Sequence, residues 1–271
     1  MPRYIFRAKT LHGYSFKILF ELLQNNFKTG CFRINKKGLF LRMTDSNRKI
    51  LVDVSLDYDK FNFYKFSNEN ELIIGFSLDQ IHKLMKAVRK KDSIVLYISR
   101  DNPNKLSIKV IPNENTKKRT TEFGIGIQTS QNVDISLPED YDKFIMINSN
   151  EFQKACKEIT SLSPNIKVII NKFIIKFFAD GGNVYDKETS FGENNESDID
   201  SDDNEDISED FDQNFDSDQL LRISKISGLC TYMQIFPKKD NPLLFKSNVG
   251  QIGQISIFIK SKELQERDNE E

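Results

Sequence analysis

The chain has 271 residues but no tryptophan, two histidines and only three cysteines. Cys31, Cys156 and Cys230 are far apart in the sequence, and none belongs to a CxxC pair. This odd number of isolated cysteines argues against a disulfide framework or a zinc site, and it fits a reducing compartment. Because phenylalanine occurs 22 times, we expect a core of aliphatic and phenylalanine side chains.

The sequence also lacks the groups from which a catalytic centre is built. His12 and His82 have neither a second histidine nor a carboxylate at the spacing of a metal site or a catalytic triad. The stretch Gly-Ile-Gly at 124–126 lacks the further glycine and the helix of a nucleotide-binding loop, and no Walker sequence occurs. We therefore predict that the protein is not an enzyme and has no cofactor or metal site.

Long hydrophobic runs are absent as well. The first residues, MPRYIFRAKTLHG, have no apolar core of the kind found in a signal peptide. The most apolar run, KVIINKFIIKFF at 167–178, is interrupted by lysines, so no segment is suited to cross a membrane. We expect a soluble, intracellular protein.

Basic residues are missing from one segment, and this segment hides the charge of the rest of the chain. Residues 193–218 contain 13 acidic residues and no Lys or Arg, whereas the whole chain has a net charge of -1. Without this segment the chain keeps 39 basic and 27 acidic residues, which is a net charge of +12. A basic body with one acidic appendage indicates a polyanionic partner.

The acidic segment has the carboxylate spacing of a calcium-binding loop but not its turn. Loop positions 1, 3, 5 and 12 are occupied by Asp198, Asp200, Asp202 and Glu209. The glycine required at position 6 is replaced by Asp203, so the sharp turn is missing. We expect a solvated, disordered loop that projects away from the body of the protein.

Two similar halves follow each other along the chain. The first half contains a predicted helix that starts near Leu11 and another over residues 77–91, set among short strands. A polar stretch with a proline and no periodicity is typical of a connector. The second half repeats the order, with predicted helices over 150–162 and 218–229. We predict an α+β fold with three parts: an N-terminal domain 1–128, a connector 129–143 and a C-terminal domain 144–271.

Three of the predicted helices carry the same arrangement of basic residues. The stretches DQIHKLMK at 79–86, NEFQKACK at 150–157 and DQLLRISK at 218–225 each place two basic side chains three residues apart. Residues at this spacing lie on one face of a helix. The pairs are Lys83/Lys86, Lys154/Lys157 and Arg222/Lys225.

The recurrence of these pairs carries more weight than any one of them. Charge on the outer face of a single amphipathic helix usually does no more than solvate it, and the predicted inner faces are apolar, as Ile81, Leu84 and Val88 illustrate. Basic pairs at matching points of a duplicated fold, with Lys17 alone on the first helix, favour a common basic lining. Such a lining holds phosphates without reading sequence, which is typical of a protein that stays on DNA while it moves along it.

Four stretches carry a resemblance to a known family. They are GYSFKILFEL (13–22), FSLDQIHKLMKAVRKKDSIVLYI (76–98), SLPEDYDKFIMINSNEFQKACKEI (136–159) and NPLLFKSNVGQIGQISIFI (241–259). In this order and spacing the chain resembles the sliding clamps of the proliferating cell nuclear antigen (PCNA) family over essentially its whole length. The composition, rich in Asn, Lys and Ile, suggests an AT-rich genome such as that of a large DNA virus.

The resemblance implies a DNA-clamp fold, with two similar domains that each have two helices packed on antiparallel sheets. Subunits of this fold form a homotrimeric ring around duplex DNA, with the helices lining the channel. By position, the resemblance assigns seven basic residues to DNA binding: Lys17, Lys83, Lys86, Lys154, Lys157, Arg222 and Lys225.

The resemblance also implies two protein-binding surfaces. A pocket beside the connector takes up a short partner peptide, and its wall would consist of Leu51, Ile135, Leu137, Pro138, Pro242 and Phe258. Thr44 and the stretch FIKSKEL (258–264) depart from the family pattern at this pocket. Subunits join edge to edge through their sheets, and the expected apolar contacts are Phe123, Ile125, Val184 and Tyr185.

The function implied by the resemblance is that of a DNA polymerase processivity factor. Its expected partners are the polymerase, other replication and repair proteins with clamp-binding peptides, and an ATP-dependent clamp loader. It would act in the nucleus or, if viral, at the site of viral DNA replication. Three alternatives remain open: a checkpoint-type clamp subunit of a heterotrimer, a monomeric DNA-binding processivity factor, and an acidic partner-binding scaffold.

Overall fold

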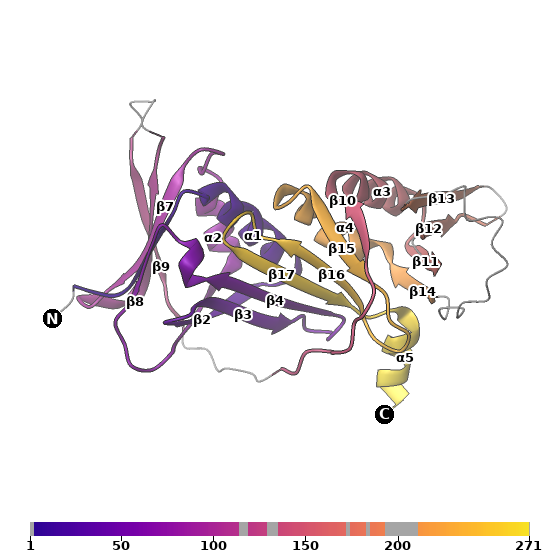
Figure 1. Cartoon of the computed structure of the whole chain (residues 1–271), viewed down its shortest axis with the longest axis horizontal. Coiled ribbons are helices and arrows are strands. Elements are labelled where there is room, and N and C mark those ends of the chain that lie inside the picture. The colour runs from indigo at the N-terminus through magenta and orange to yellow at the C-terminus, as the bar shows by residue number, and fades with distance from the viewer. Residues whose placement is uncertain are drawn as a thin grey trace. The chain divides into compact units, whose positions relative to one another are not determined.

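The computed structural model describes residues 3–113, 119–128, 135–171, 174–182, 185–192 and 211–270. The chain divides into two compact units. Unit 1 consists of Met1–Ser136, Gly228–Cys230 and Ser247–Ser256, and unit 2 consists of Leu137–Ser227, Thr231–Lys246 and Ile257–Glu271. Figure 1 labels the helices and most of the strands.

Unit 1 is built on two antiparallel arrays of strands. The first is a five-stranded sheet in the order β5 (Phe63–Phe66), β1 (Tyr4–Thr10), β7 (Ser93–Ser99), β8 (Asn102–Ile111) and β9 (Thr121–Gly126). The second contains β6 (Leu72–Ser77), β2 (Thr29–Asn35), β3 (Gly38–Thr44) and β4 (Ile50–Asp57) as neighbours in this order. The turn between β2 and β3 requires glycine at position 38, because φ is +150° and a Cβ would lie 2.2 Å from Leu56 O.

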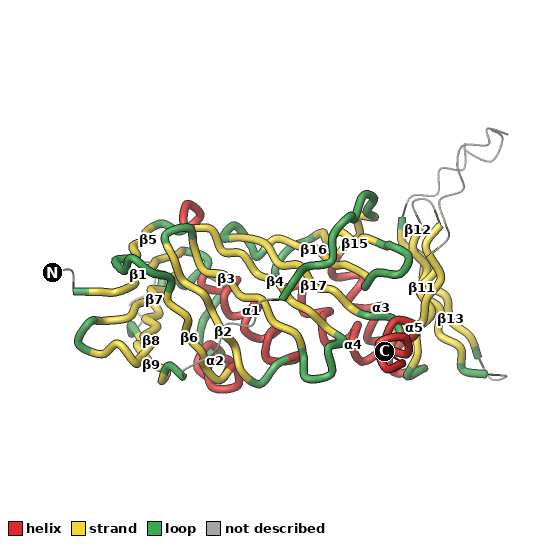
Figure 2. Tube along the Cα trace, turned by 90° about the horizontal axis from the view of Figure 1, so that it is seen from below, coloured by secondary structure: helices red, strands yellow, loops and turns green. Residues whose placement is uncertain are grey.

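The helices of unit 1 pack their apolar sides against these strands. Helix α1 spans Gly13–Asn26, and helix α2 spans Leu78–Met85. The Phe20 ring on α1 lies 6.2 Å from Phe32 on β2 and 6.2 Å from Phe76 on β6, all three being buried. Figure 2 shows α1 and α2 beside each other, and the two helices are in contact.

Unit 2 repeats this plan. One run of antiparallel strands is β10 (Ile145–Asn148), β15 (Tyr232–Phe236), β16 (Leu243–Asn248) and β17 (Gly253–Ile259), of which β16 ends and β17 begins in unit 1. A separate sheet has the order β13 (Asp186–Phe191), β12 (Ile174–Asp180), β11 (Asn165–Asn171) and β14 (Phe211–Asp216). Helix α3 (Ser149–Leu162) buries Phe152, whose ring lies 5.9 Å from Phe177 and 5.7 Å from Phe245. The next helix along the chain, after β14, is α4 (Ser217–Ile223), which continues into a 3-10 turn over Ser224–Gly228.

The duplication seen in the sequence is therefore a duplication of topology. The strand order β6-β2-β3-β4 corresponds to β14-β11-β12-β13, and β1-β7-β8-β9 corresponds to β10-β15-β16-β17. Helices α1 and α2 occupy the same places in chain order as α3 and α4. The predicted α+β fold, with two helices packed on antiparallel sheets in each domain, is confirmed.

Several details differ from the sequence predictions. The first helix begins at Gly13 and not near Leu11, which precedes it with 55% of its surface exposed. The second helix ends at Met85 and not at residue 91, and Leu84 is 36% exposed instead of buried. Leu84 points away from the core because Ile81 and Met85 already fill the buried side of this short helix.

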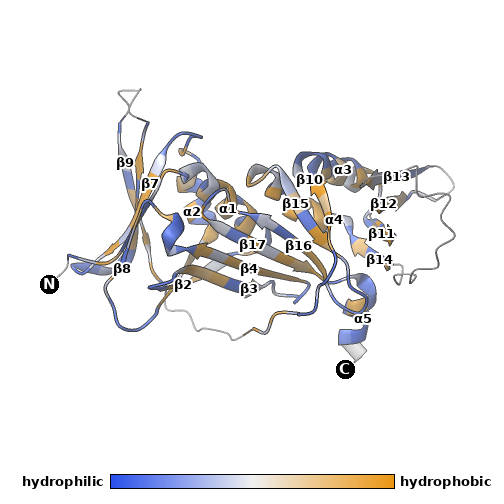
Figure 3. Ribbon diagram, viewed as in Figure 1, coloured by the Kyte–Doolittle hydropathy of each residue, from blue (hydrophilic) through white to orange (hydrophobic). Residues whose placement is uncertain are grey.

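A fifth helix follows the last strand, where the sequence predicted only an altered tail. Helix α5 spans Lys262–Glu270 and is largely hydrophilic, as Figure 3 shows. The acidic segment is described only from Phe211 onward, where β14 begins, so the candidate calcium residues Asp198, Asp200, Asp202 and Glu209 lie outside the described residues. Within the described ranges, no helix is both long and apolar enough to span a membrane.

Candidate functional site

The predicted DNA-binding residues of unit 1 lie on its two helices and directly after the second, which ends one residue before Lys86. Lys17 on α1 donates from Nζ to the main-chain oxygens of Lys86 at 3.0 Å and Val88 at 3.1 Å, so it fastens α1 to the end of α2. Lys83 pairs with Asp79 one turn earlier, with 2.7 Å between Nζ and Oδ2. The side chains of Lys83 and Lys86 are exposed. The structure thus brings Lys17 to the C-terminal end of α2, beside the predicted pair.

The corresponding residues of unit 2 lie on α3, α4 and the 3-10 turn. Lys154 and Lys157 are exposed on α3, Arg222 is exposed on α4, and Lys225 is half-buried in the turn. The two helices are in contact, and Gln153 on α3 donates from Nε2 to Ser224 O at 3.2 Å. Unit 2 therefore presents its basic side chains on one connected pair of helices, as unit 1 does.

Carboxylates on the same helices already pair with several of these cations. Lys154 Nζ lies 2.8 Å from Glu151 Oε1, and this hydrogen bond raises the pKa of the lysine. Arg222 Nη2 lies 2.5 Å from Asp218 Oδ2. All of these groups are largely exposed, and exposed ion pairs contribute little to stability. A phosphate can replace the carboxylate as partner without a large loss of folding free energy.

The helix starts that carry these residues are fixed by local capping. Ser77 Oγ accepts from Gln80 N at 3.4 Å at the start of α2. Asn148 Oδ1 accepts from the main-chain nitrogens of Asn150 at 2.9 Å and Glu151 at 3.3 Å at the start of α3. Such caps satisfy main-chain donors that have no partner within the helix. They therefore set the register in which the basic side chains face outward.

The predicted partner-binding residues are divided between the units. Leu51 and Ile135 belong to unit 1 and are half-buried. The members in unit 2 are Leu137, Pro138 and Pro242, which are half-buried, and Phe258, which is buried.

In unit 1, Arg42 contacts the middle of the connector. Its Nη1 donates to Ile135 O at 2.9 Å, and its Nε lies 2.7 Å from Asp53 Oδ1. The guanidinium thus joins β3, β4 and the connector through one planar group, which suits arginine better than lysine. Arg42 was not predicted, because only the fold brings it near a residue 93 positions away.

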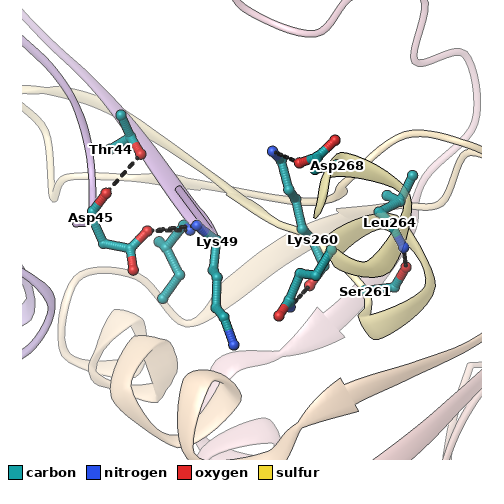
Figure 4. Close-up of polar contacts among 9 residues, drawn as sticks. Thr44, Asp45, Lys49, Lys260, Ser261, Leu264 and Asp268 are labelled. Carbon is teal, nitrogen blue, oxygen red and sulfur yellow. Dashed lines mark hydrogen bonds and ion pairs between the residues drawn. The ribbon is translucent and has the colours of Figure 1, made fainter. Parts of the chain in front are cut away.

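Thr44, noted as a departure from the family pattern, uses its hydroxyl locally. Thr44 Oγ1 donates to Asp45 O at 3.1 Å, and Asp45 Oδ1 accepts from Lys49 N at 2.7 Å (Figure 4). The same oxygen accepts from Ile50 N at 2.8 Å. The polar side chain of Thr44 is therefore part of a closed turn between β3 and β4.

In unit 2, Tyr141 links two of the predicted pocket residues. Its Oη donates to Pro242 O at 2.5 Å, and its ring centroid lies 6.0 Å from that of Phe258. A further ring, Phe236, lies 6.4 Å from Tyr141. Burial raises the pKa of Tyr141 above its ordinary value, so the phenol stays a hydrogen-bond donor. The sequence analysis did not single out Tyr141, although an aromatic residue within the polar stretch EDYDK (139–143) could have indicated that the connector is anchored there.

The predicted subunit contacts lie at two sheet edges. Phe123 and Ile125 are on β9, an edge of the five-stranded sheet, where Phe123 is half-buried and Ile125 is buried. Tyr185 directly precedes β13, an edge of the four-stranded sheet, and its Oη donates to Leu162 O. Val184 lies outside the described residues.

In the described part of the chain, no group of three or more His, Cys, Asp and Glu side chains is arranged to hold a metal.

Family models match both halves of the chain. Residues 5–135 match the Proliferating cell nuclear antigen, N-terminal domain, and residues 136–262 match the C-terminal domain. The chain belongs to the PCNA family. The two matched domains account for the duplicated topology, and α5 lies almost wholly beyond the second match.

Relatives of this PCNA-family chain come from viruses and from cells. It is 23% identical over 268 residues to "Probable DNA polymerase sliding clamp 1" of Paramecium bursaria Chlorella virus 1, covering 94% of this chain and 96% of the relative. It is 24% identical over 237 residues to the proliferating cell nuclear antigen of Saccharomyces cerevisiae, covering 85% and 88%. The crystal structure of PCNA from Entamoeba histolytica matches with a TM-score of 0.80 at 18% identity, covering 96% of this chain and 99% of that one.

Proposed function

We propose that this PCNA-family chain is a DNA polymerase sliding clamp. Three copies form a ring that encircles duplex DNA, slides along it and tethers the polymerase and other replication and repair proteins. The observation that carries the proposal is the recurrence, in both units, of a helix pair with exposed lysine or arginine side chains. The similarity to a probable DNA polymerase sliding clamp of a virus and to yeast proliferating cell nuclear antigen supports the same function.

The basic helix faces suit a partner that moves past them. Lys83, Lys86, Lys154 and Lys157 are long, exposed side chains that hold phosphates without contacting base edges. Their present carboxylate partners are exposed, so each lysine can exchange between Asp or Glu and a passing phosphate. Binding should depend steeply on salt because phosphate contacts release counterions.

The repeated topology supports assembly into a closed ring. In unit 1, the start of β17 lies beside β4, and a Cβ on Gly253 would come within 1.9 Å of Ser55 O. By the duplication, β9 corresponds to β17 and β13 corresponds to β4. The same pairing between copies joins β9 of one subunit to β13 of the next, a head-to-tail contact that closes into a ring if the rotation permits.

The remaining partners follow from the same proposal. Clamp-binding peptides dock beside Leu137, Pro138, Pro242 and Phe258 in unit 2 and beside Leu51 and Ile135 in unit 1. An ATP-dependent loader opens the ring, and the chain itself performs no chemistry. Its place of action is the nucleus or the site of viral DNA replication.

Charge reversal on the helices tests the proposal. The variant Lys83→Glu with Lys154→Glu should abolish stimulation of the cognate polymerase on a primed circular template, because two channel cations per subunit become anions. The matched control is Lys60→Glu with Lys246→Glu, which makes the same charge change at exposed positions outside α1, α2, α3 and α4. Circular dichroism melting establishes that both variants are folded. Full stimulation by the helix variant, or equal loss in the control, contradicts the proposal.

A further inference from the structure

The five-stranded sheet of unit 1 has one buried face and one exposed face. Phe6, Ala8, Leu96 and Ile108 alternate with the exposed positions and are buried in the core. The register aligns the other face across the sheet. Arg7 lies opposite Lys65 and Tyr97, Lys9 lies opposite Phe63 and Val95, and Lys109 lies opposite Val95 and Glu122. We call these residues, with Tyr4 and Lys105, the outer sheet face; Val95, between Lys9 and Lys109, is its buried member.

The outer sheet face is strongly basic. It carries five cations and one carboxylate: Arg7, Lys9, Lys65, Lys105 and Lys109 against Glu122. Glu122 accepts a hydrogen bond from Tyr97 Oη. Within the described residues, none of the five cations forms an ion pair, in contrast to Lys83, Lys154 and Arg222 on the helices. Unpaired cations on one face attract a polyanion.

Aromatic rings lie among these cations. Phe63 is 44% exposed, and the Arg7 guanidinium lies 5.6 Å from its ring centroid and 5.3 Å from that of Tyr4. Tyr97 contacts Tyr4 edge to face, with 5.3 Å between ring centroids. Arg7 is thus held between two rings, which keeps a planar cation and an exposed aromatic face side by side.

This combination selects among polyanions. A duplex presents phosphates but hides the faces of its bases, so it leaves the rings unused. An acidic peptide meets the cations but has no planar group for Phe63. Single-stranded DNA offers both phosphates and free base faces, and proteins that bind it combine basic surfaces with aromatic stacking platforms. From the charge and ring geometry, we infer that the outer sheet face is a binding surface for single-stranded DNA.

The inferred surface is distinct from the proposed duplex-binding residues. Every residue of the outer sheet face is on β1, β5, β7, β8 or β9, whereas Lys17 and Lys83 are on α1 and α2 and Lys86 directly follows α2. The inference needs only unit 1 and does not rest on ring formation. A clamp with such a face would hold an unpaired template or displaced strand while its channel holds the duplex.

Fluorescence anisotropy with the full-length protein tests the inference. The probes are a labelled 20-nucleotide oligo-dT and a labelled 20-base-pair duplex. The variant Arg7→Gln with Lys65→Gln should weaken oligo-dT binding at least about fivefold and lower the salt slope of log Kd by about 1.4, since each lost contact to a single strand accounts for about 0.7. The matched α2 control, Lys83→Gln with Lys86→Gln, removes the same charge from α2 and the residue that follows it. Because these lysines are proposed to hold phosphates, this variant should weaken duplex binding, and it should weaken oligo-dT binding less than Arg7→Gln with Lys65→Gln does.

Two further variants test stacking apart from charge. Phe63→Ala and Phe63→Leu leave all cations in place, and both should weaken oligo-dT binding by about fivefold or more, the effect of losing one stacked base. Neither should change duplex binding. Thermal melting checks that each variant keeps the wild-type fold.

Each contrary result overturns the inference. Oligo-dT binding that is unchanged in both Arg7→Gln/Lys65→Gln and Phe63→Ala shows that the outer sheet face is not used. An equal loss in the α2 control shows that single strands bind the helices. Displacement of oligo-dT by a poly-glutamate peptide at the same concentration as by unlabelled oligo-dT shows that charge alone is recognised. Loss of duplex binding in the α2 control alone bears on the proposed function and not on this surface.

Discussion

The basic side chains of the helices differ in what they already contact within the subunit. Lys17 Nζ is held by two main-chain oxygens at the end of α2, whereas Lys83 and Lys154 each pair with a carboxylate on their own helix. A carbonyl at the C-terminal end of a helix carries partial negative charge, so Lys17 also stabilises α2. Lys17 thus has a structural role beside its predicted contact with DNA.

Tyr141 gives a residue-scale prediction about the connector. Tyr141→Phe keeps the ring against Phe258 but loses the hydrogen bond to Pro242 O, and it should lower the free energy of unfolding by about 1 kcal/mol. Tyr141→Ala also removes the ring and should cost about 2 kcal/mol more. Urea denaturation measures both values. Equal stabilities of wild type and Tyr141→Ala would show that the connector is not anchored here.

The three cysteines should differ sharply in reactivity. Cys156 is buried on α3, and burial raises the pKa of its thiol, so almost no reactive thiolate forms near neutral pH. Cys31 and Cys230 are partly exposed. A thiol-specific reagent should therefore modify two cysteines rapidly in the native protein and the third only after denaturant is added. Rapid modification of all three would contradict the buried position of Cys156.

At the scale of elements, helix α5 shows how an edge strand is covered. The main-chain N–H of Asn214, on the edge strand β14, donates to Glu263 Oε1 at 3.1 Å and to Oε2 at 3.2 Å. The side-chain Nδ2 of Asn214 donates to Glu263 Oε1 at 2.8 Å. Ser261 Oγ accepts from Leu264 N at the start of the helix, and Lys260 pairs with Asp268 (Figure 4). Because β14 is one edge of its sheet, α5 leaves β13 as the edge available for pairing.

Glu263 makes the attachment of α5 dependent on pH. Burial disfavours its charge, but the hydrogen bonds from the main chain, Asn214 and Ser261 outweigh this, and the pKa is lowered from 4.5. A lowered folded pKa stabilises the protein above the ordinary glutamate pKa, and this contribution is lost as the pH falls through the folded value. Glu263→Gln should therefore cost about 1 kcal/mol at pH 7, a small value because the carboxylate is partly exposed.

The control for Glu263 is the same comparison at acid pH. Wild type and Glu263→Gln should approach equal stability below the folded pKa, where both side chains are neutral. Thermal melting from pH 7 down to the acid limit of the fold measures this difference. A difference that stays constant over the whole range would show that the charge of Glu263 does not hold α5.

Sequence patterns predicted the elements whose stability is local and missed those held by distant contacts. The periodic apolar residues of α1 and α3 and the basic pairs beside them were visible because helix faces repeat every three to four residues. Helix α5 has no apolar stripe, and it depends on Asn214, Asp216 and Asp240, which only the fold brings near. Leu11 and Leu84 were misplaced because an apolar residue near a helix end fits the pattern whether or not it is covered.

At the scale of the whole molecule, the duplicated fold leaves two matching edges open. Strands β9 and β13 occupy the places that β17 and β4 occupy in the internal repeat. Pairing them between copies extends each sheet and removes both edges from solvent, which lowers the risk of unspecific strand association. In the proposed ring, the basic helix faces of several copies would surround the same DNA.

The mass of the purified chain in solution tests this account most directly. Light scattering coupled to size exclusion, at micromolar concentration and physiological salt, should give close to three times the 31.5 kDa mass of the chain. A value that stays at 31.5 kDa up to the highest soluble concentration would contradict the ring. It would leave a monomeric DNA-binding factor or a subunit that requires different partners.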